Sequence, residues 1–257
     1  MHQPQVVPHR SLYFPYQVYP AFVPSPGILN RSPVVIVGAG PIGLTLALEL
    51  ARHGVRSIVL AAQQQVCEGS RAIVFTRRSM EIFQQVGVSE VVAEQGLPWR
   101  FGNSYYRGQR VFRMEAPVDP HDRFAPMTNL QQQYLEQHLV EAAQAQPLIE
   151  VRWGNKVIDI EQGVDGAVLQ VDTPGDAYSL EADWVVAADG ARSGLRSLLG
   201  LKLEGASYEG RFVIADIRIK LDLPTERLAF FDPAWNPGNT VLMHREPGDI
   251  WRIDYQL

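Results

Sequence analysis

The stretch PVVIVGAGPIGLTLALELARHGVRSIVL, residues 33–60, decides the fold of this chain. Its first apolar run, residues 34–37, is typical of a parallel strand that is buried on both faces. Helical spacing then predicts an amphipathic helix with these inward residues: Leu44, Ala47, Leu48 and Ala51. Gly54 is expected to end the helix in the left-handed conformation, and residues 55–60 are typical of a second strand. Strand, turn, helix and strand together predict one βαβ unit.

A G-x-G-x-x-G motif, Gly38-Ala39-Gly40-Pro41-Ile42-Gly43, joins the first strand to the helix. Gly38 permits a tight turn, Gly40 lets the backbone approach a pyrophosphate, and Gly43 lets the helix pack closely on the strand. The first N–H groups of the helix would face the phosphates. The motif alone is a weak signal, but a preceding strand and a following helix are the context of a dinucleotide-binding site.

The composition is that of an ordinary globular protein. The chain has 257 residues, of which 46% are hydrophobic and 20% charged, enough for one large or two modest domains. A net charge of -5 gives no basic surface for nucleic acid or for an anionic membrane. The one cysteine, Cys67, excludes an internal disulfide, and the sequence shows no secretory signal or bilayer-spanning apolar run. We therefore expect a cytoplasmic protein with no nucleic-acid or membrane partner.

Residues 1–32 form a separate segment ahead of the βαβ unit. Prolines recur through it and exclude a helix or a central strand, at positions 4, 8, 15, 20, 24 and 26. Aromatic residues alternate with them: Tyr13, Phe14, Tyr16, Tyr19 and Phe22. This pattern favours an extended arm that lies on a protein surface, with a disordered tail as the alternative.

The rest of the chain is predicted to mix helices and strands. Thr76 is expected to cap a helix with Met80, Phe83 and Val86 on one face, and residues 130–146 predict another helix with Leu135 inward. Strands are predicted within residues 104–114 and at 156–161, 167–172 and 180–187, and after Gly200 within 211–221, 240–246 and 249–257. Since a domain rarely ends within a strand, we expect the chain to be a fragment of a longer protein.

A second motif, Asp189-Gly190, ends an apolar strand in the stretch ADWVVAADGARSGLRSLLG, residues 182–200. An aspartate at the carboxyl end of a buried strand can accept hydrogen bonds from a ligand in the crevice there. An alternative of equal weight is that Asp189 caps the short helix that follows. That helix would carry Leu195, Leu198 and Leu199 on one side.

The chain resembles the flavoprotein aromatic hydroxylases, a family of single-component FAD-dependent monooxygenases, in three stretches: GAGPIGLTLALELARHG, EGSRAIVFTRRSMEIF and DWVVAADGARSGLR. Within that family it is most similar to the 3-(3-hydroxyphenyl)propionate hydroxylase-like branch. The stretches have the family's order and spacing, and the likeness runs from about residue 33 to residue 257. The resemblance implies an α/β fold. A Rossmann-like FAD/NAD(P)-binding domain with a β-meander insertion would span residues 33–200, and an incomplete, mostly-β substrate domain would span residues 201–257.

The resemblance also implies a set of cofactor-binding residues: Gly38, Gly40, Gly43, Arg71, Gln132, Asp189 and Gly190. The glycines of the first motif would face the FAD pyrophosphate, and Asp189-Gly190 would contact FAD and the pyridine nucleotide. Arg71 would lie near the flavin and its phosphates, or else be a solvated loop arginine. Gln132 would contact the cofactor from the side. Gln131 or Gln133 would replace it after a one-residue shift, and a plain surface glutamine is the alternative. Two arginines would brace the Asp-Gly loop, Arg192 and Arg196.

The implied reaction inserts one oxygen atom from O2 into a small phenolic ring, with FAD as cofactor and NAD(P)H as co-substrate. Because the flavin carries the hard chemistry, the protein need supply no nucleophile or metal. The sequence agrees with this, since it has no metal-spaced His/Cys/carboxylate cluster and no nucleophile motif. No catalytic side chain is assigned, and a homodimer is possible. Two alternatives stand beside this function: a truncated or degenerate FAD-binding fragment without catalytic activity, and, less favoured, a plain NAD(P) dehydrogenase.

Two departures from the family bear on cofactor binding. The acidic residue that should bind the adenosine ribose at the end of the second strand is replaced by Ala61. A charge-assisted hydrogen bond there would contribute roughly 1.5–3 kcal/mol, and Gln63 or Gln64 could offer only a weaker neutral acceptor. The family's later Gly-Asp motif is also missing, since Gly175-Asp176 and Gly248-Asp249 occur in the wrong order or context and are predicted to be turns.

Three further polar residues on the late strands receive no role: Asp216, His244 and Arg252. Alternation along a strand predicts such residues on solvent-facing positions.

Overall fold

The computed structural model describes residues 14–25, 31–69 and 71–257, and it divides the chain into two compact units. The first unit consists of the described residues up to Glu68 together with residues 135–204. The second unit consists of residues 69–134 and 205–257.

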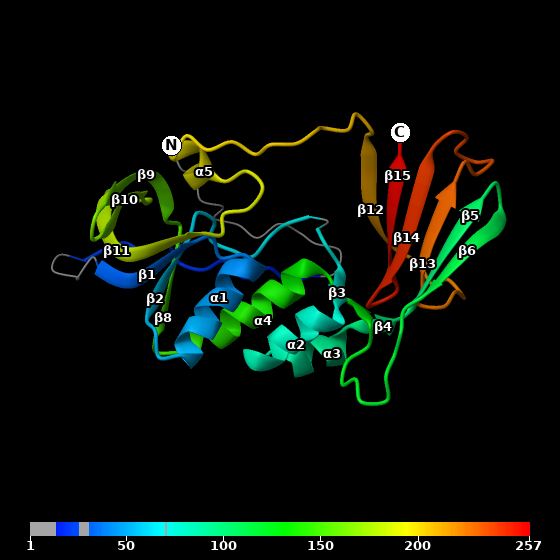
Figure 1. Ribbon diagram of the computed structural model, residues 1–257, viewed down its shortest axis with the longest axis horizontal. Coiled ribbons are helices and arrows are strands. Elements are labelled where there is room, and N and C mark those ends of the chain that lie inside the picture. Colours follow the sequence, from blue (N-terminus) through cyan, green and yellow to red (C-terminus); the bar gives the residue numbers. More distant parts are fainter. Residues whose placement is uncertain (1–13, 26–30, 70) are drawn as a thin grey trace. The chain divides into compact units, whose positions relative to one another are not determined.

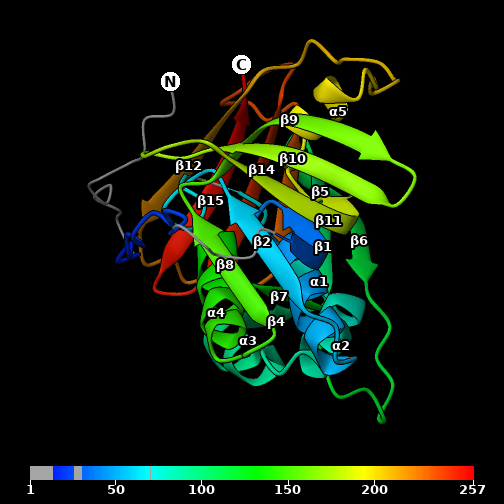
Figure 2. The same cartoon turned by 90° about the vertical axis from the view of Figure 1, so that its left-hand side faces the viewer.

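The first unit is built on a six-stranded sheet with the strand order β8-β2-β1-β11-β10-β9 (Figures 1 and 2). Neighbouring strands are parallel across one part of it: β8 (Ile149–Trp153), β2 (Ser57–Ala61), β1 (Arg31–Val37) and β11 (Tyr178–Ala187). An antiparallel meander completes it: β11, β10 (Gly166–Asp172) and β9 (Lys156–Gly163). The α/β class and the meander predicted from the sequence are confirmed.

The predicted βαβ unit forms around the centre of this sheet. β1 lies between β2 and β11, so residues 34–37 are buried, as their unbroken apolar run predicted. Helix α1 (Pro41–Arg52) buries Leu44, Ala47 and Leu48, while Ala51 is half-buried. Gly54 follows the helix with φ +75°, which confirms the predicted left-handed end. Figure 1 shows α1 and much of α4 (Gln132–Gln144) on one side of the parallel strands.

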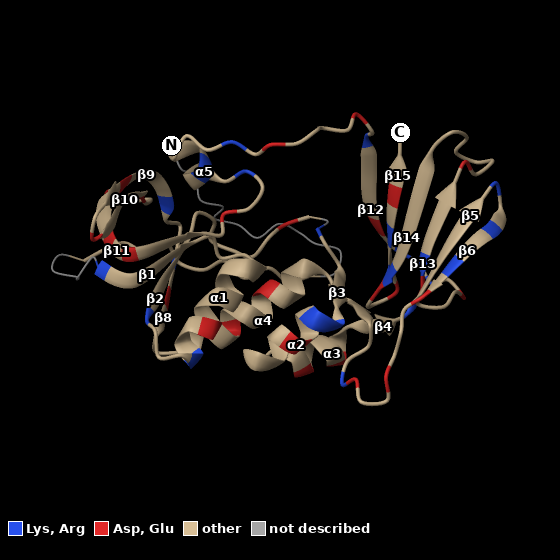
Figure 3. Ribbon diagram, in the orientation of Figure 1, with Lys and Arg blue, Asp and Glu red and all other residues tan. Residues whose placement is uncertain are grey.

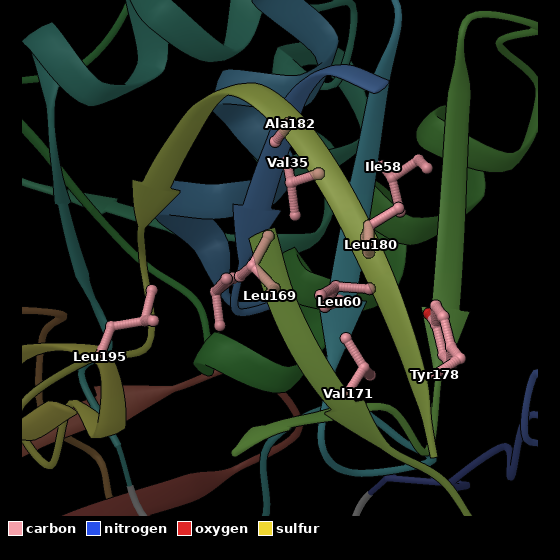
Figure 4. Packing of buried hydrophobic residues seen from close by; sticks show 10 residues of the cluster. Val35, Ile58, Leu60, Leu169, Val171, Tyr178, Leu180, Ala182 and Leu195 are labelled. Atoms are coloured by element: carbon pink, nitrogen blue, oxygen red, sulfur yellow. The ribbon is translucent and has the colours of Figure 1, made fainter. Parts of the chain in front are cut away.

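The meander packs over the parallel strands and forms a hydrophobic core with them. Figure 4 shows side chains from β1, β2, β10 and β11 that point toward one another: Val35, Ile58, Leu60, Leu169, Val171 and Leu180. Leu169, Val171 and Leu180 are fully buried. Hairpin turns at residues 163–166 and 173–177 join the strands of the meander, as the sequence predicted, and the β9–β10 pairing shifts register between Gln170 and Val171.

One edge of β11 is only partly used. β10 pairs with Tyr178–Ala182, and no strand of the described residues pairs with residues 183–187 on that side. A groove of about 520 Å³ lies beside this edge, lined among others by Ile160, Trp184, Leu195 and Leu199. Helix α5 (Gly194–Leu198) follows β11, and of its predicted leucines only Leu195 is buried.

The second unit joins segments from two distant parts of the chain in one six-stranded sheet of order β12-β15-β14-β13-β5-β6. Its strands are β5 (Phe101–Tyr106), β6 (Gln109–Glu115), β12 (Phe212–Arg218), β13 (Arg227–Phe231), β14 (Thr240–Glu246) and β15 (Ile250–Gln256). β13 and β5 pair in parallel, and this pairing connects the early pair of strands to the late four. β13 was not predicted, whereas the other five strands were.

A smaller sheet and two helices complete the second unit: β3 (Val74–Thr76), β7 (Met127–Asn129), β4 (Leu97–Trp99), α2 (Arg77–Gln85) and α3 (Ser89–Gln95). Thr76 Oγ1 accepts a hydrogen bond from Ser79 N at 3.4 Å, which confirms the predicted cap, and Met80 and Phe83 are buried. Lys/Arg and Asp/Glu residues are interspersed in each unit, with no large region of one sign on the drawn ribbon (Figure 3).

The core of the first unit can be tested at Leu180. We expect Leu180→Ala to lower the free energy of unfolding by about 2–5 kcal/mol, because a fully buried leucine loses its contacts and leaves a cavity. The matched control is Val164→Ala in the exposed β9–β10 turn, with an expected change within about 0.5 kcal/mol. Urea unfolding followed by circular dichroism measures both, and equal effects of the two substitutions would contradict this description of the core.

Candidate functional site

The turn from β1 to α1 is a close approach between three strand ends. Gly38 N donates a hydrogen bond to Leu60 O at the end of β2, at 2.8 Å. A Cβ added to Gly38 would lie 2.3 Å from Ala188 O, just after β11, and its φ of +114° disfavours any side chain. Glycine is therefore required at position 38 for two independent reasons, conformation and space.

The other two glycines of the motif have opposite surroundings. A Cβ on Gly43 would lie 2.0 Å from Gly38 O, so this glycine lets α1 pack against the turn. A Cβ on Gly40 would meet no atom within 4 Å. Gly40 therefore presents bare backbone to open space, as the predicted approach of a pyrophosphate requires.

The start of α1 is prepared for a negatively charged ligand. Gly40 is its N-cap and provides no side-chain cap, Pro41 occupies the first turn, and no acidic residue lies in that turn. The leading N–H groups of such a helix lack intrahelical partners, and the helix dipole is positive at this end. An anionic group over Gly40 would accept hydrogen bonds from these N–H groups and would be stabilised by the positive end of the helix dipole.

Asp189 and Gly190 lie beside the glycine turn. Ala188 N donates to Val37 O at 2.8 Å, which holds the residue before Asp189 against the last residue of β1. The Oδ2 atom of Asp189 accepts a hydrogen bond from Leu195 N at 3.1 Å, in the first turn of α5. The structure thus places Asp189 beside the glycine turn and gives it a contact with the helix start, as its alternative role predicted, while its contact with a ligand stays a prediction.

Two neighbours hold the Asp-Gly loop in shape. Ser193 is the N-cap of α5, and its hydroxyl accepts a hydrogen bond from Arg196 N at 3.0 Å. The guanidinium of Arg196 donates to Ala191 O at 2.7 Å, which is the bracing role expected of this arginine. Gly190 has φ +78°, a conformation that favours glycine.

Arg71 and Gln132 belong to the second unit. The side chain of Arg71 is exposed, and its carbonyl oxygen accepts a hydrogen bond from Arg252 Nη1. Gln132 is half-buried and is the first residue of α4, whereas Gln131 and Gln133 are each only 1% exposed. The predicted cofactor contacts of Arg71 and Gln132 stay predictions.

The end of β2 lacks a carboxylate, and two of the glutamines that follow it differ in exposure and in contacts. Ala61 is buried, and its carbonyl accepts a hydrogen bond from Asn155 N at 2.8 Å. The Gln64 side chain is also buried and donates to Tyr19 O at 2.9 Å, so its amide is taken up by the N-terminal segment. Gln63 is exposed.

A buried ionic cluster lies on one face of the large sheet of the second unit. Arg252 on β15 donates to both carboxylate oxygens of Asp216 on β12, at 2.8 Å and 3.0 Å, and its Nη2 lies 3.1 Å from Glu246 Oε1. His244 is directly opposite Arg252 in the β14–β15 register. The expectation that Asp216, His244 and Arg252 face solvent was wrong, because this face of the sheet is covered: His244 and Arg252 are 8% and 4% exposed.

Burial shifts the titration of this cluster in opposite directions. It raises the pKa of Glu246 to about 7, an effect that Arg252 reduces and Asp216 increases. It lowers the pKa of His244 to about 4, with the charges of Arg227 and Arg252 acting in the same direction. His244 is therefore neutral at pH 7, and its Nδ1 atom has no hydrogen-bond partner in the described part of the chain.

Among residues 14–25, 31–69 and 71–257, no group of three or more His, Cys, Asp or Glu side chains could hold a metal ion. No helix within those same ranges is both long enough and apolar enough to cross a membrane.

The two shifted groups predict opposing pH effects on stability. The low pKa of His244 in the folded chain stabilises it above about pH 6.5, and this contribution is lost as the pH falls toward 4. The high pKa of Glu246 stabilises the folded chain below about pH 4.5, and this contribution is lost as the pH rises to 7. We expect Glu246→Gln to leave only the His244 effect, so unfolding free energy rises more steeply between pH 4.5 and 6.5 than in the parent.

Urea unfolding at a series of pH values measures this change of slope. His244→Gln is the reciprocal variant and should leave stability falling with pH over the same window. The carboxyl groups of Asp216 and Asp254 remain in both variants, so their contributions cancel in the comparison. Parent-like slopes in both variants would show that neither group titrates as assigned.

Solved structures of flavin-dependent enzymes share the fold of this chain. The p-nitrophenol 4-monooxygenase PnpA from Pseudomonas putida DLL-E4 superimposes with a TM-score of 0.81 at 25% identity, covering 89% of this chain and 58% of that one. The flavin-dependent monooxygenase PieE, solved in complex with FAD and substrate, gives a TM-score of 0.72 at 27% identity and covers 91% of this chain and 44% of that one.

Sequence relatives agree with the structures. The 3-(3-hydroxy-phenyl)propionate/3-hydroxycinnamic acid hydroxylase 2 of Burkholderia vietnamiensis (strain G4 / LMG 22486) is 34% identical over 205 residues, which are 77% of this chain and 37% of that protein. The para-nitrophenol 4-monooxygenase of Pseudomonas sp. (strain WBC-3) is 27% identical over 231 residues, 86% of this chain and 55% of that protein. The chain thus spans between about a third and just over half of the relatives it matches.

A family model described as FAD binding domain matches residues 31–236, a range that contains the glycine turn, Asp189-Gly190 and most of the second unit. Sequence, fold and site geometry therefore place this chain in the FAD binding domain family, among proteins similar to the flavoprotein aromatic hydroxylases.

Proposed function

We propose that this chain binds FAD at the turn between β1 and α1, as the cofactor-binding part of an aromatic-ring monooxygenase. The observation that carries the proposal is the open space over Gly40 beside an uncapped helix start. A dinucleotide pyrophosphate needs both features at once, because its oxygens must come close to the backbone and be met by free N–H groups.

The residues present fit the phosphate part of FAD. Gly38 and Gly43 have no space for side chains and keep the turn tight, while Gly40 leaves room for the ligand. Asp189 and Gly190 stand at the neighbouring strand end, where they would line the same crevice. Bound FAD would supply the redox chemistry, and the chain itself binds and orients the cofactor. Arg71 and Gln132 remain proposed cofactor contacts, as the family resemblance implies.

The names of the relatives support the class of substrate that we propose. Their names describe hydroxylases of hydroxyphenylpropionate and a monooxygenase of nitrophenol, which supports a small phenolic ring as substrate. Molecular oxygen and NAD(P)H are proposed as co-substrates and a homodimer as the assembly. The strands of residues 201–257 would begin the substrate-binding part of the protein.

FAD is expected to bind more weakly here than in a site with an acidic residue at the end of β2. Without that carboxylate, Ala61 leaves the ribose hydroxyls short of a contact that contributes roughly 1.5–3 kcal/mol, equivalent to a tenfold or greater loss of affinity. This same observation favours the second candidate function, a chain with the flavin fold that holds no flavin and catalyses nothing.

Uptake of FAD by the purified chain separates the two candidates. We expect the parent to quench flavin fluorescence on titration and to gain the visible flavin absorbance. A parent that stays colourless and takes up no added FAD would contradict the proposal. That result would favour the second candidate, a chain with the flavin fold that binds no flavin and has no catalytic activity.

Gly40→Ala tests the location of the site. We expect a loss of FAD affinity of tenfold or more, because the new methyl group fills the space over the turn. The unfolding free energy should fall by no more than about 1 kcal/mol, since alanine is a poorer N-cap than glycine but its methyl meets no protein atom within 4 Å. Gly163→Ala is the matched control, since its Cβ would meet only Gly166 O at 3.6 Å. Isothermal titration calorimetry that gives Gly40→Ala the affinity of the parent would place the pyrophosphate elsewhere.

A further inference from the structure

The described part of the N-terminal arm, residues 14–25, lies against the first unit, which confirms the docked arm predicted from its aromatic residues. Residues 1–13 and 26–30 of the predicted segment lie outside the described residues. The arm precedes residue 31, where the family match begins. The arm's contacts therefore involve residues outside the range that the family model matches.

The arm first binds the loop that follows β2. Tyr19 N donates to Gln64 O at 2.7 Å, and Gln64 Nε2 donates to Tyr19 O at 2.9 Å, so one residue of the loop holds both backbone groups of one residue of the arm. Tyr16 OH donates to Cys67 O further along the same loop, at 3.2 Å.

The arm then binds the turn that follows β8. Phe22 N donates to Trp153 O at 2.8 Å, and Asn155 Nδ2 donates to Phe22 O at 2.9 Å. The Tyr19 ring stacks on the Trp153 ring with centroids 4.5 Å apart and planes 8° apart, and both side chains are buried. The chain passes so close that a Cβ on Gly154 would lie 2.8 Å from Ala21 Cβ.

A buried polar chain fixes this second contact to the sheet. Arg152, 1% exposed, places its guanidinium 4.3 Å from the centre of the Phe22 ring and donates to Tyr178 OH at 3.0 Å. Tyr178 OH donates in turn to Asn155 Oδ1 at 2.8 Å, and Asn155 binds the arm through Phe22 O. Such a network holds its members in one arrangement, because breaking any bond leaves a buried polar group unsatisfied.

Both contacts lie where a dinucleotide's adenosine would be received. In open α/β sheets the ligand lies outside the carboxyl ends of the parallel strands, and the ribose-binding acid ends the second strand of the unit. Here that position is Ala61, which offers no carboxylate, and β8 is the neighbour of β2 on that side. The arm ties down the segment after each of these two strands.

We propose that the N-terminal arm is a strap for the adenosine half of the site. It holds the loop after β2 and the turn after β8 in the conformation that receives adenosine, and so offsets part of the loss caused by Ala61. The inference rests on the proposed function, binding of FAD. Because coupling between two binding events is reciprocal, docking of the arm strengthens adenosine binding, and bound adenosine strengthens docking of the arm.

Gln64→Met tests the strap with one uncharged substitution, because it removes the donor to Tyr19 O and keeps a side chain of similar length. The matched control is Gln17→Met, an exposed position within the arm itself. We expect FAD and ADP to bind Gln64→Met about tenfold more weakly than the parent, and Gln17→Met to bind them as the parent does. A chain without residues 1–25 should show at least the same loss.

Hydrogen exchange supplies a readout that needs no ligand. Amides of residues 62–68 and 153–157 should exchange faster in Gln64→Met than in the parent and in Gln17→Met, and added ADP should slow them in the parent. Unchanged affinity in Gln64→Met and in the shortened chain would overturn the strap. Tighter binding without the arm would also overturn it, because the arm would then obstruct the site.

ADP separates a failure of the strap from a failure of the proposed function. If the parent takes up no FAD, the proposed function fails, and ADP, which carries the adenosine and the pyrophosphate alone, decides the strap. Tighter ADP binding by the parent than by Gln64→Met supports it. Equal or undetectable ADP binding by both overturns it.

Discussion

The first unit depends on a turn that has no space for a side chain. Gly38 donates its N–H to the end of β2 and lies so close to the residue after β11 that a Cβ would clash there, so one residue links the ends of three neighbouring strands. The start of α1 follows directly and is fixed with it, as is Asp189 beside it. The packing of the apolar strands thus places the start of α1 and leaves the backbone of Gly40 open to a ligand. The same close packing that stabilises the strand ends therefore forms the candidate site.

Local pattern predicted most of the elements, and it failed where long-range pairing decides. The apolar run of β1, the helical spacing of α1 and the Thr76 cap are readable because each depends on residues a few positions apart. β13 was missed because it is stabilised by a parallel pairing with β5, which lies more than a hundred residues earlier in the chain. β8 was missed because its alternating Glu150 and Arg152 do not look like a buried strand, although Arg152 is satisfied by Tyr178 and Glu150.

The sequence predicted the position of the candidate site but not the contacts of its side chains. Glycine spacing located the turn, and the Asp-Gly pair located the neighbouring strand end, because both motifs follow apolar strands. Sequence could not decide whether Asp189 caps a helix or meets a ligand, and its contact with Leu195 N shows that capping is at least one of its roles. Nor could alternation say which face of β14 and β15 is covered, so the buried pair Arg252 and Glu246 had no local signal. The sequence signal for this cluster is one charged residue on each of β12, β15 and β14, which are neighbours in the sheet: Asp216, Arg252 and Glu246.

The partly used edge of β11 has a consequence for further strand pairing. Residues 183–187 are parallel to β1 on one side, but on the other side no strand of the described residues pairs with their backbone, and a groove lies next to it. The stretch is DWVVA, rich in β-branched residues, and its Trp184 side chain is 74% exposed. An open, apolar strand edge of this kind is a template onto which another extended chain can add. The same stretch of β11 thus has space and backbone groups on its outer side for one additional strand, beside the groove lined by Trp184.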